Sequence, residues 1–272
     1  MNVDLHTHST ASDGTLTPAE LVAAAAAAGV ELLALTDHDT IDGYLSVRDE
    51  SLPLKLVAGV ELTVAWSRRD VHVVGLAFNA DDSALNELLR RQRSARVERA
   101  RTMAERLQRR GIPDMLSAAT NAANGQVPGR VHFAQSLVAA GVVPTTRRAF
   151  KQYLGDGKAC HVRGDWVTLP EAIACLTNAG GVAILAHPLG YRLTATSLTA
   201  LVDDFAVAGG HAVEWSDTAE HASLAKRLHR CVTAHGLAVS SGSDYHGAAQ
   251  PWRQLGRTDA VPADLRTVYG DW

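Results

Sequence analysis

The segment Asp4-Leu5-His6-Thr7-His8-Ser9 places two histidines two positions apart within a short apolar run at residues 3–8. We predict a β-strand there. Because successive side chains of a strand point to opposite faces, Asp4, His6 and His8 would share one face. A His-X-His pair taken alone is a weak signal, since two core or surface histidines explain it equally well. Its meaning depends on whether such residues recur at the other predicted strands.

Six further runs have the composition of buried strands, and helical patterns separate many of them. Thr17-Pro18 with Glu20 predicts the start of the first helix, and Gly29 predicts its end. Strands that alternate with helices indicate βαβ units, so we predict an α/β fold with a barrel-like parallel sheet of seven strands. The further strand runs are residues 32–36, 54–62, 71–78, 182–186, 212–215 and 237–240, and the later helical patterns are residues 169–179, 198–208 and 219–234.

Histidines and acidic residues recur at the ends of these runs. Glu61 ends the third run, His72 begins the fourth and His187 ends the fifth. In a parallel α/β barrel the carboxyl ends of the strands meet at one mouth, so we expect these side chains to converge. Carboxylates gathered without cations would repel one another, and imidazoles among them indicate a site for several metal ions. The alternative is a set of scattered polar loop residues. The predicted ligands are His6, His8, Asp13, His38, Glu61, His72, His187, Asp244 and His246.

The expected cofactors are two or three divalent ions. Nitrogen and oxygen donors without a thiolate suit Mn, with Fe or Zn as alternatives. Cys160, Cys175 and Cys231 are widely spaced and form no CxxC motif, which argues against a disulfide framework and against a cysteine zinc site.

Composition excludes several other classes of protein. The 272 residues carry a net charge of -3, with 46% hydrophobic and 20% charged residues, which is typical of a globular protein. We therefore expect no duplex DNA partner. No apolar run approaches the roughly 20 residues that span a bilayer, and the first residues lack the pattern of a signal peptide. We expect a cytoplasmic protein with no membrane and no obligate protein partner.

The middle of the chain has helical pattern and little strand signal. We predict a first part of the barrel at residues 1–111, a small helical insertion at 112–165, and the second part of the barrel at 166–272. Insertions at loop ends commonly cover active sites, so we expect this one to act as a substrate-binding lid. Nine arginines lie between residues 90 and 110. We interpret them as a solvated helix face, with contact to a short RNA strand as the alternative.

Five motifs together resemble those of the PHP (polymerase and histidinol phosphatase) family. They are Asp-Leu-His-Thr-His-Ser at 4–9, Thr-Asp-His-Asp at 36–39, Gly-Val-Glu at 59–61, Ala-His-Pro at 186–188 and Gly-Ser-Asp-Tyr-His at 242–246. The resemblance implies a distorted seven-stranded (β/α)7 barrel of PHP type that binds up to three divalent metals. It implies one ion on His6, His8, Glu61 and Asp244, a second on Glu61, His72 and His187, and a third on Asp13, His38 and His246.

Further segments resemble the stand-alone bacterial branch of this family, which includes 3',5'-nucleoside bisphosphate phosphatases and 5'-3' exoribonucleases. They are residues 130–134, 151–154, 157–158, 251–252 and 255–257. The resemblance implies removal of the 3'-phosphate of a substrate such as adenosine 3',5'-bisphosphate, giving AMP and phosphate, by a metal-bound hydroxide. The residues assigned to the reacting centre are Glu61, Asp13, Asp244 and His246.

Other functions stay open from the sequence. The chain could be a 5'-3' exoribonuclease on short 5'-phosphorylated single-stranded RNA, or a phosphatase of the histidinol-phosphate type. A non-catalytic metal-binding PHP module is a further alternative, although all nine predicted ligands are present.

A substrate with a second phosphate needs fixed cations outside the metal site. Arg130 and His132 are the leading candidates, followed by Lys158, His161 and Arg192, and an arginine fork matches phosphate oxygens well. Relatives often have Gly-Arg-Tyr after Ala-His-Pro, whereas this chain has Leu-Gly-Tyr-Arg at 189–192, which displaces the arginine. The remaining histidines are expected at structural or surface positions, and they are His211, His221, His229 and His235.

Overall fold

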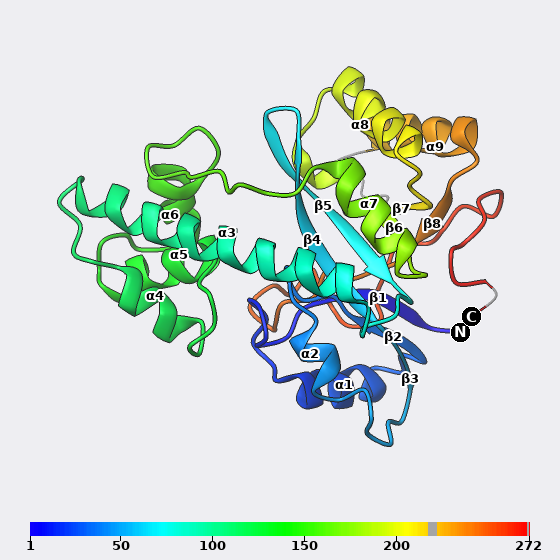
Figure 1. The fold of residues 1–272 in the computed structure, drawn as a ribbon, viewed down its shortest axis with the longest axis horizontal. Coiled ribbons are helices and arrows are strands. Elements are labelled where there is room, and N and C mark those ends of the chain that lie inside the picture. Colours follow the sequence, from blue (N-terminus) through cyan, green and yellow to red (C-terminus); the bar gives the residue numbers. More distant parts are fainter. Residues whose placement is uncertain (217–221, 271) are drawn as a thin grey trace.

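The strands form two sheets in a computed structural model, which describes residues 1–216, 222–270 and 272. A three-stranded parallel sheet has the order β1-β2-β3, and a five-stranded sheet has the order β4-β5-β6-β7-β8 (Figure 1). The strands are β1 (Val3–Thr7), β2 (Leu32–Leu35), β3 (Lys55–Val57), β4 (Gly59–Trp66), β5 (Arg69–Leu76), β6 (Val182–Leu185), β7 (Ala212–Glu214) and β8 (Ala238–Ser240).

This arrangement corrects the prediction of seven strands in one parallel barrel. The predicted run at 54–62 contains two strands, because the chain leaves the first sheet after β3 and enters the second at β4. Strands β4 and β5 form an antiparallel hairpin, and β5 is also antiparallel to β6, whereas β6, β7 and β8 are parallel. A continuous apolar run shows that a segment is buried, but it reveals neither a change of sheet nor the direction of the next strand.

Backbone hydrogen bonds join the two sheets at the ends of β1 and β2. The amide of Leu5 donates to the carbonyl of Ser241 over 3.0 Å, and the amide of Asp244 donates to the carbonyl of His6 over 2.8 Å. The amide of Asp39 donates to the carbonyl of Glu61 over 2.9 Å. These bonds bring the segments that follow β1, β2 and β8 beside the middle of β4.

Helices cover the sheets. α1 (Pro18–Ala27) begins with a capping box between Thr17 and Glu20, which confirms the predicted start. α7 (Leu169–Asn178), α8 (Ala195–Val207) and α9 (Ala222–His235) pack on the second sheet in the largest hydrophobic core of the described residues. The predicted helix at 219–234 starts in residues that lie outside the described ones. Two shorter elements accompany these helices, namely α2 (Asp42–Leu45) and the 3-10 helix η2 (Pro188–Tyr191).

A second hydrophobic core lies in the middle of the chain. The long helix α3 (Ser83–Gln108) packs its first half in the main core through Leu85 and Leu88. Its second half packs through Met103 and Leu107 against the helices that follow, so it extends away from the sheets (Figure 1). This second core begins at Ala100, ahead of the boundary expected at 112. The following helices are α4 (Leu116–Ala122), α5 (Arg130–Ala139), α6 (Thr146–Ala149) and the π-helix η1 (Phe150–Leu154).

None of the helices in the described part of the chain combines the length and the apolar composition needed to cross a membrane.

Candidate metal centre

The nine residues predicted as ligands lie close together where the two sheets meet. His6 lies in β1, His38 follows β2, and His187 follows β6. His72 lies near the start of β5, and it reaches the same place because β5 runs antiparallel to β6. Glu61 lies inside β4 rather than at its end, since the β4–β5 hairpin continues past the neighbouring strands. The remaining members come from the segments after β1 and β8, and they are His8, Asp13, Asp244 and His246.

Glu61 occupies the centre of this cluster, and its side chain is 1% exposed. Its Oε1 atom lies 2.7 Å from Nδ1 of His72 and 2.9 Å from Nε2 of His187. Its Oε2 atom lies 2.8 Å from Nδ1 of His38 and 3.3 Å from Nε2 of His8. A single carboxylate therefore faces imidazoles on both of its oxygens, which is the arrangement that a bridging ligand needs.

The ligand atoms fall into three overlapping groups, in each of which all atoms lie within 4.8 Å of one another. Asp244 adjoins one of them, with its Oδ1 atom 3.3 Å from Nε2 of His8 and 3.6 Å from Nε2 of His6. His8 and His38 each belong to two groups, so the sets overlap more than the family resemblance implies. The groups are His8, Asp13, His38 and His246; His6, His8 and Glu61; and His38, Glu61 and His72.

Unpaired buried atoms show that metal ions suit this cluster. Oδ1 of Asp13, Nδ1 of His38 and Oε2 of Glu61 are buried and make no hydrogen bond of acceptable geometry, although Nδ1 of His38 and Oε2 of Glu61 lie 2.8 Å apart. Buried polar atoms normally have partners, so three such atoms in one cluster call for a bound ligand. Imidazole nitrogens and carboxylate oxygens are donors that Mn, Fe and Zn accept. The residues present therefore fit a centre for divalent ions.

The cluster also holds protonation states that favour metal binding. Burial opposes the charge of Glu61, but His72, His38 and His6 outweigh it and hold the pKa of that carboxyl well below its ordinary value. Burial lowers the pKa of His72 to about 4, despite the opposing charge of Glu61. Burial and the nearby His246 and His38 also hold the pKa of His8 well below its ordinary value. Ionised carboxylates and neutral imidazoles are the forms that coordinate metals.

Glu214 is a functional residue that the sequence reasoning missed. It ends β7, is 5% exposed, and accepts a hydrogen bond from Nδ1 of His6 over 2.6 Å. Burial lowers the pKa of His6, but Glu214 and Glu61 outweigh this and raise it to about 10. A carboxylate on the far nitrogen of a ligating histidine fixes its tautomer and orientation. The available signal was an acidic residue at the end of the run 212–215, the same pattern that identified Glu61.

Three non-glycine residues of the centre have left-handed backbone conformations. The φ angles are 28° at His187, 51° at Asp244 and 53° at Asp39. Such conformations are uncommon for residues with a Cβ atom and cluster at functional sites. Two of these residues are predicted ligands and the third directly follows His38, so the uncommon conformations coincide with the cluster.

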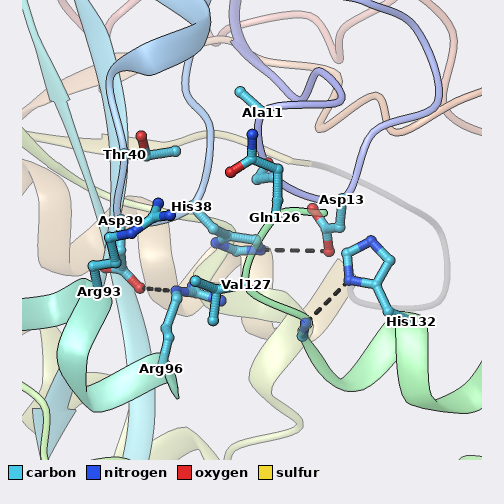
Figure 2. A pocket seen from close by; sticks show the side chains of 12 residues that line it. Ala11, Asp13, His38, Asp39, Thr40, Arg93, Arg96, Gln126, Val127 and His132 are labelled. Carbon is cyan, nitrogen blue, oxygen red and sulfur yellow. Dashed lines mark hydrogen bonds and ion pairs between the residues drawn. The ribbon is translucent and has the colours of Figure 1, made fainter. Parts of the chain in front are cut away.

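A pocket opens beside the cluster (Figure 2). Asp13 and His38 line one side of it, while Arg93 and Arg96 of α3 line another, with His132 of α5 nearby. The interpretation of the arginines at 90–110 as a solvated face holds for six of the nine, which are exposed, but not for Arg96, Arg99 and Arg106. The side chain of Arg96 is 14% exposed, and Arg99 is 8% exposed. The pocket thus joins the metal ligands to fixed positive charge.

The five predicted substrate-binding residues have different surroundings. His132 lines the pocket, and its Nδ1 accepts a hydrogen bond from the Gly129 amide over 3.0 Å. Nη1 of Arg130 and Nε2 of His161 both contact Oδ1 of Asp156, at 3.0 Å and 3.3 Å. The other two are exposed and do not line this pocket, and they are Lys158 and Arg192.

The remaining histidines of the described chain have partners outside the centre. His211 accepts a hydrogen bond from the Ala183 amide over 3.1 Å. His229 pairs with Asp264 over 2.9 Å, and His235 pairs with Asp203 over 2.7 Å. His221 lies outside the described residues.

The fold and the cluster define a metal-dependent phosphoesterase, and comparisons with known proteins identify its family. The PHP domain model matches residues 4–138. A 5'-3' exoribonuclease of Haemophilus influenzae is 40% identical over 93% of this chain and 93% of its own length. A 3',5'-nucleoside bisphosphate phosphatase of Chromobacterium violaceum is 36% identical over 98% of this chain and 95% of its own length.

A solved structure supports the same assignment. It is an amidohydrolase from Chromobacterium violaceum with bound sulfate and no metal, and it superposes with a TM-score of 0.89 at 36% identity, covering 99% of this chain and 95% of that one. The chain belongs to the PHP domain family. It is a hydrolase that acts on phosphate esters.

Proposed function

We propose that this enzyme removes the 3'-phosphate from 3',5'-nucleoside bisphosphates such as adenosine 3',5'-bisphosphate. The observation that carries the proposal is the pocket, whose lining combines the predicted metal ligands Asp13 and His38 with Arg93, Arg96 and His132. A substrate with two phosphates needs both kinds of positive charge, because one phosphate reacts at the ions and the other is only held. The sulfate bound by the Chromobacterium violaceum relative without metal supports anion binding in this family.

The nine predicted ligands would hold two or three divalent ions, with Mn as the expected metal. Bound divalent ions supply Lewis acidity and lower the pKa of a coordinated water. Glu61 would contribute the central carboxylate to more than one ion. We assign Asp13, Asp244 and His246 to the reacting centre with Glu61.

Asp13 has a specific place in this proposal, because it belongs to the cluster and also lines the pocket. Burial opposes its charge, but His38 and His246 outweigh it and hold the pKa of Asp13 well below its ordinary value. It is therefore an anion at neutral pH, which suits a metal ligand at the boundary between ions and substrate. Residues of the helical insertion between 126 and 132 line the same pocket, which supports the proposed role of the insertion as a lid.

Hydrolysis of short RNA from its 5' end is the second candidate function. The observation that favours it is a name that several relatives share. Those of Haemophilus influenzae and Escherichia coli, at 40% and 38% identity, are both named 5'-3' exoribonuclease. The same centre would cleave a phosphodiester, and the arginines of α3 would then contact the strand.

Phosphate release from a panel of substrates tests the proposal. The purified protein is loaded with Mn and given adenosine 3',5'-bisphosphate, adenosine 3'-phosphate, histidinol phosphate and a short 5'-phosphorylated RNA. We expect the highest kcat/KM for the bisphosphate. Cleavage of the RNA far faster than any mononucleotide would establish the exoribonuclease instead, and preference for histidinol phosphate would exclude both nucleotide substrates.

A further inference from the structure

Arg96 differs from the exposed arginines of α3 because its guanidinium is fixed by contacts on several sides. Its Nε atom donates to Oδ2 of Asp39 over 2.5 Å, and its Nη2 atom donates to Oγ1 of Thr63 over 3.0 Å. The carbon of the guanidinium lies 5.6 Å from the centre of the Trp166 ring. A cation over an indole face is attracted to it. The side chain is therefore fixed before any ligand binds.

Asp39 is the residue that sets this orientation. Its side chain has no exposed surface, and its Oδ1 atom accepts hydrogen bonds from the Thr63 amide over 2.7 Å and from Nε2 of Gln92 over 2.8 Å. Both carboxylate oxygens of Asp39 are thus occupied. Oδ1 binds Thr63 and Gln92, and Oδ2 binds Arg96. Asp39 also follows His38, and its amide bonds to Glu61. The guanidinium and the metal ligands consequently share one rigid support.

One side of the Arg96 guanidinium is left for a ligand. Its Nη1 atom makes no hydrogen bond to the described residues, and Arg96 lines the pocket together with Asp13 and His38. A fixed guanidinium with free N–H groups is well suited to phosphate oxygens, because little side-chain entropy is lost when the bond forms.

A second arginine, Arg99, places another positive charge next to Arg96. Arg99 lies one turn further along α3, and no carboxylate of the described residues lies within 4.0 Å of it. Its Nε atom donates to the carbonyl of Val162 over 2.9 Å, and its guanidinium lies 5.4 Å from the Trp166 ring centre. Asp39 therefore neutralises only one of two neighbouring guanidinium groups, and the buried one, Arg99, is left without a carboxylate. A buried positive charge without a carboxylate partner favours an anion in the adjacent pocket.

We propose that Arg96 binds the non-reacting phosphate of the substrate, and that Asp39 is its positioning residue. This inference rests on the proposed bisphosphate substrate and assigns the second phosphate to α3. Arg130, the leading candidate from the sequence, has its guanidinium on Asp156 instead.

Kinetics with two substrates test the assignment. Arg96→Met keeps much of the packing against Trp166 but removes the N–H groups, and Arg96→Lys keeps the charge but loses the fork. We expect kcat/KM for adenosine 3',5'-bisphosphate to fall about 10- to 100-fold in Arg96→Met, as the loss of a charge-assisted hydrogen bond predicts, mostly through KM. The value for adenosine 3'-phosphate, which lacks the second phosphate, should change less than threefold. Asp39→Asn should weaken bisphosphate binding in the same selective way.

The control is Arg101→Met on the same helix, since Arg101 is 63% exposed and pairs with Glu98 away from the pocket. The kcat/KM of Arg101→Met should match that of the unmodified protein on both substrates. Equal losses on both substrates in Arg96→Met would overturn the assignment, and so would a selective loss in Arg130→Met without one in Arg96→Met. The unmodified protein tests the proposed function separately, because failure to hydrolyse the bisphosphate would refute that function before any variant is compared.

A structural measurement on the unmodified protein does not depend on how the variants fold. Crystals of the chelator-treated protein with adenosine 3',5'-bisphosphate should show one phosphate within hydrogen-bond distance of Nη1 of Arg96. A nucleotide bound with both phosphates away from Arg96 would overturn the inference.

Discussion

Replacement of Glu214 by alanine should weaken metal binding although Glu214 is not a predicted ligand. Its Oε2 atom accepts a 2.6 Å hydrogen bond from Nδ1 of His6, and both residues are buried. This bond holds a proton on Nδ1, so Nε2 is the nitrogen that faces the cluster. The pKa of about 10 leaves Nε2 protonated while no ion is bound, and a bound ion would replace that proton on a nitrogen that the nearby negative charge makes more basic. Loss of such a partner typically costs 10- to 100-fold in metal affinity, which is about 1.4–2.7 kcal/mol.

Calorimetric titration of Mn into chelator-treated protein measures this effect. Glu214→Ala should raise the Kd of the affected site about 10- to 100-fold, and Glu214→Gln, which keeps an oxygen acceptor without the charge, should have a smaller effect. Asp264→Ala is the matched control, because Asp264 is 64% exposed and forms the same kind of pair with His229 away from the centre. An Mn affinity in folded Glu214→Ala within twofold of the unmodified protein would refute the reasoning.

Three further predictions concern the centre itself. Glu61→Gln should lower kcat by at least about 100-fold while circular dichroism stays unchanged, because an amide cannot bridge two ions as a carboxylate does; retention of most activity would exclude a bridging role. Chelation of divalent ions should abolish phosphate release, and added Mn should restore it; activity that survives complete chelation would contradict a metal centre. For Asp13, a carboxyl pKa held below the ordinary 3.8 contributes stability that is present above that pH and is lost as the pH falls through the folded value. Metal-free protein should therefore lose stability below about pH 4, and Asp13→Asn should show a weaker acid dependence in urea unfolding; an identical dependence would argue against the lowered pKa.

The proximity of the predicted ligands followed from the sequence because their type and position repeat. Glu61, His187 and Asp244 each lie at or after an apolar run, and strand ends that meet at one mouth bring such residues together. What the sequence could not supply was the role of Arg96. Its helix has polar residues on most sides, and only the tertiary contacts with Asp39 and Trp166 distinguish it from its exposed neighbours.

The fold was predicted less completely than the site. Helix starts were evident where a capping box and a proline coincide, as at Thr17-Pro18, because those signals act within a few residues. Strand direction is decided by non-local pairing, so the reversal at β5 left no trace in the apolar pattern. For the same reason the second core, which begins within α3 at Ala100, was not visible as a boundary inside a continuous helical pattern.

The β4–β5 hairpin makes the centre depend on residues that carry no chemistry. Glu61 and His72 stand on partner strands, and the pairing of Trp66 with Arg69 across the two-residue turn at 67–68 sets their register. If one residue were added to that turn, the pairing of β5 with β4 could slip by one residue. Because side chains alternate along a strand, His72 would then point to the opposite face of the sheet. All nine predicted ligands would still be present in order. A chain of this family can therefore keep every motif and yet no longer encode the centre, so the length of this turn is as informative for recognising an active member as the ligands themselves.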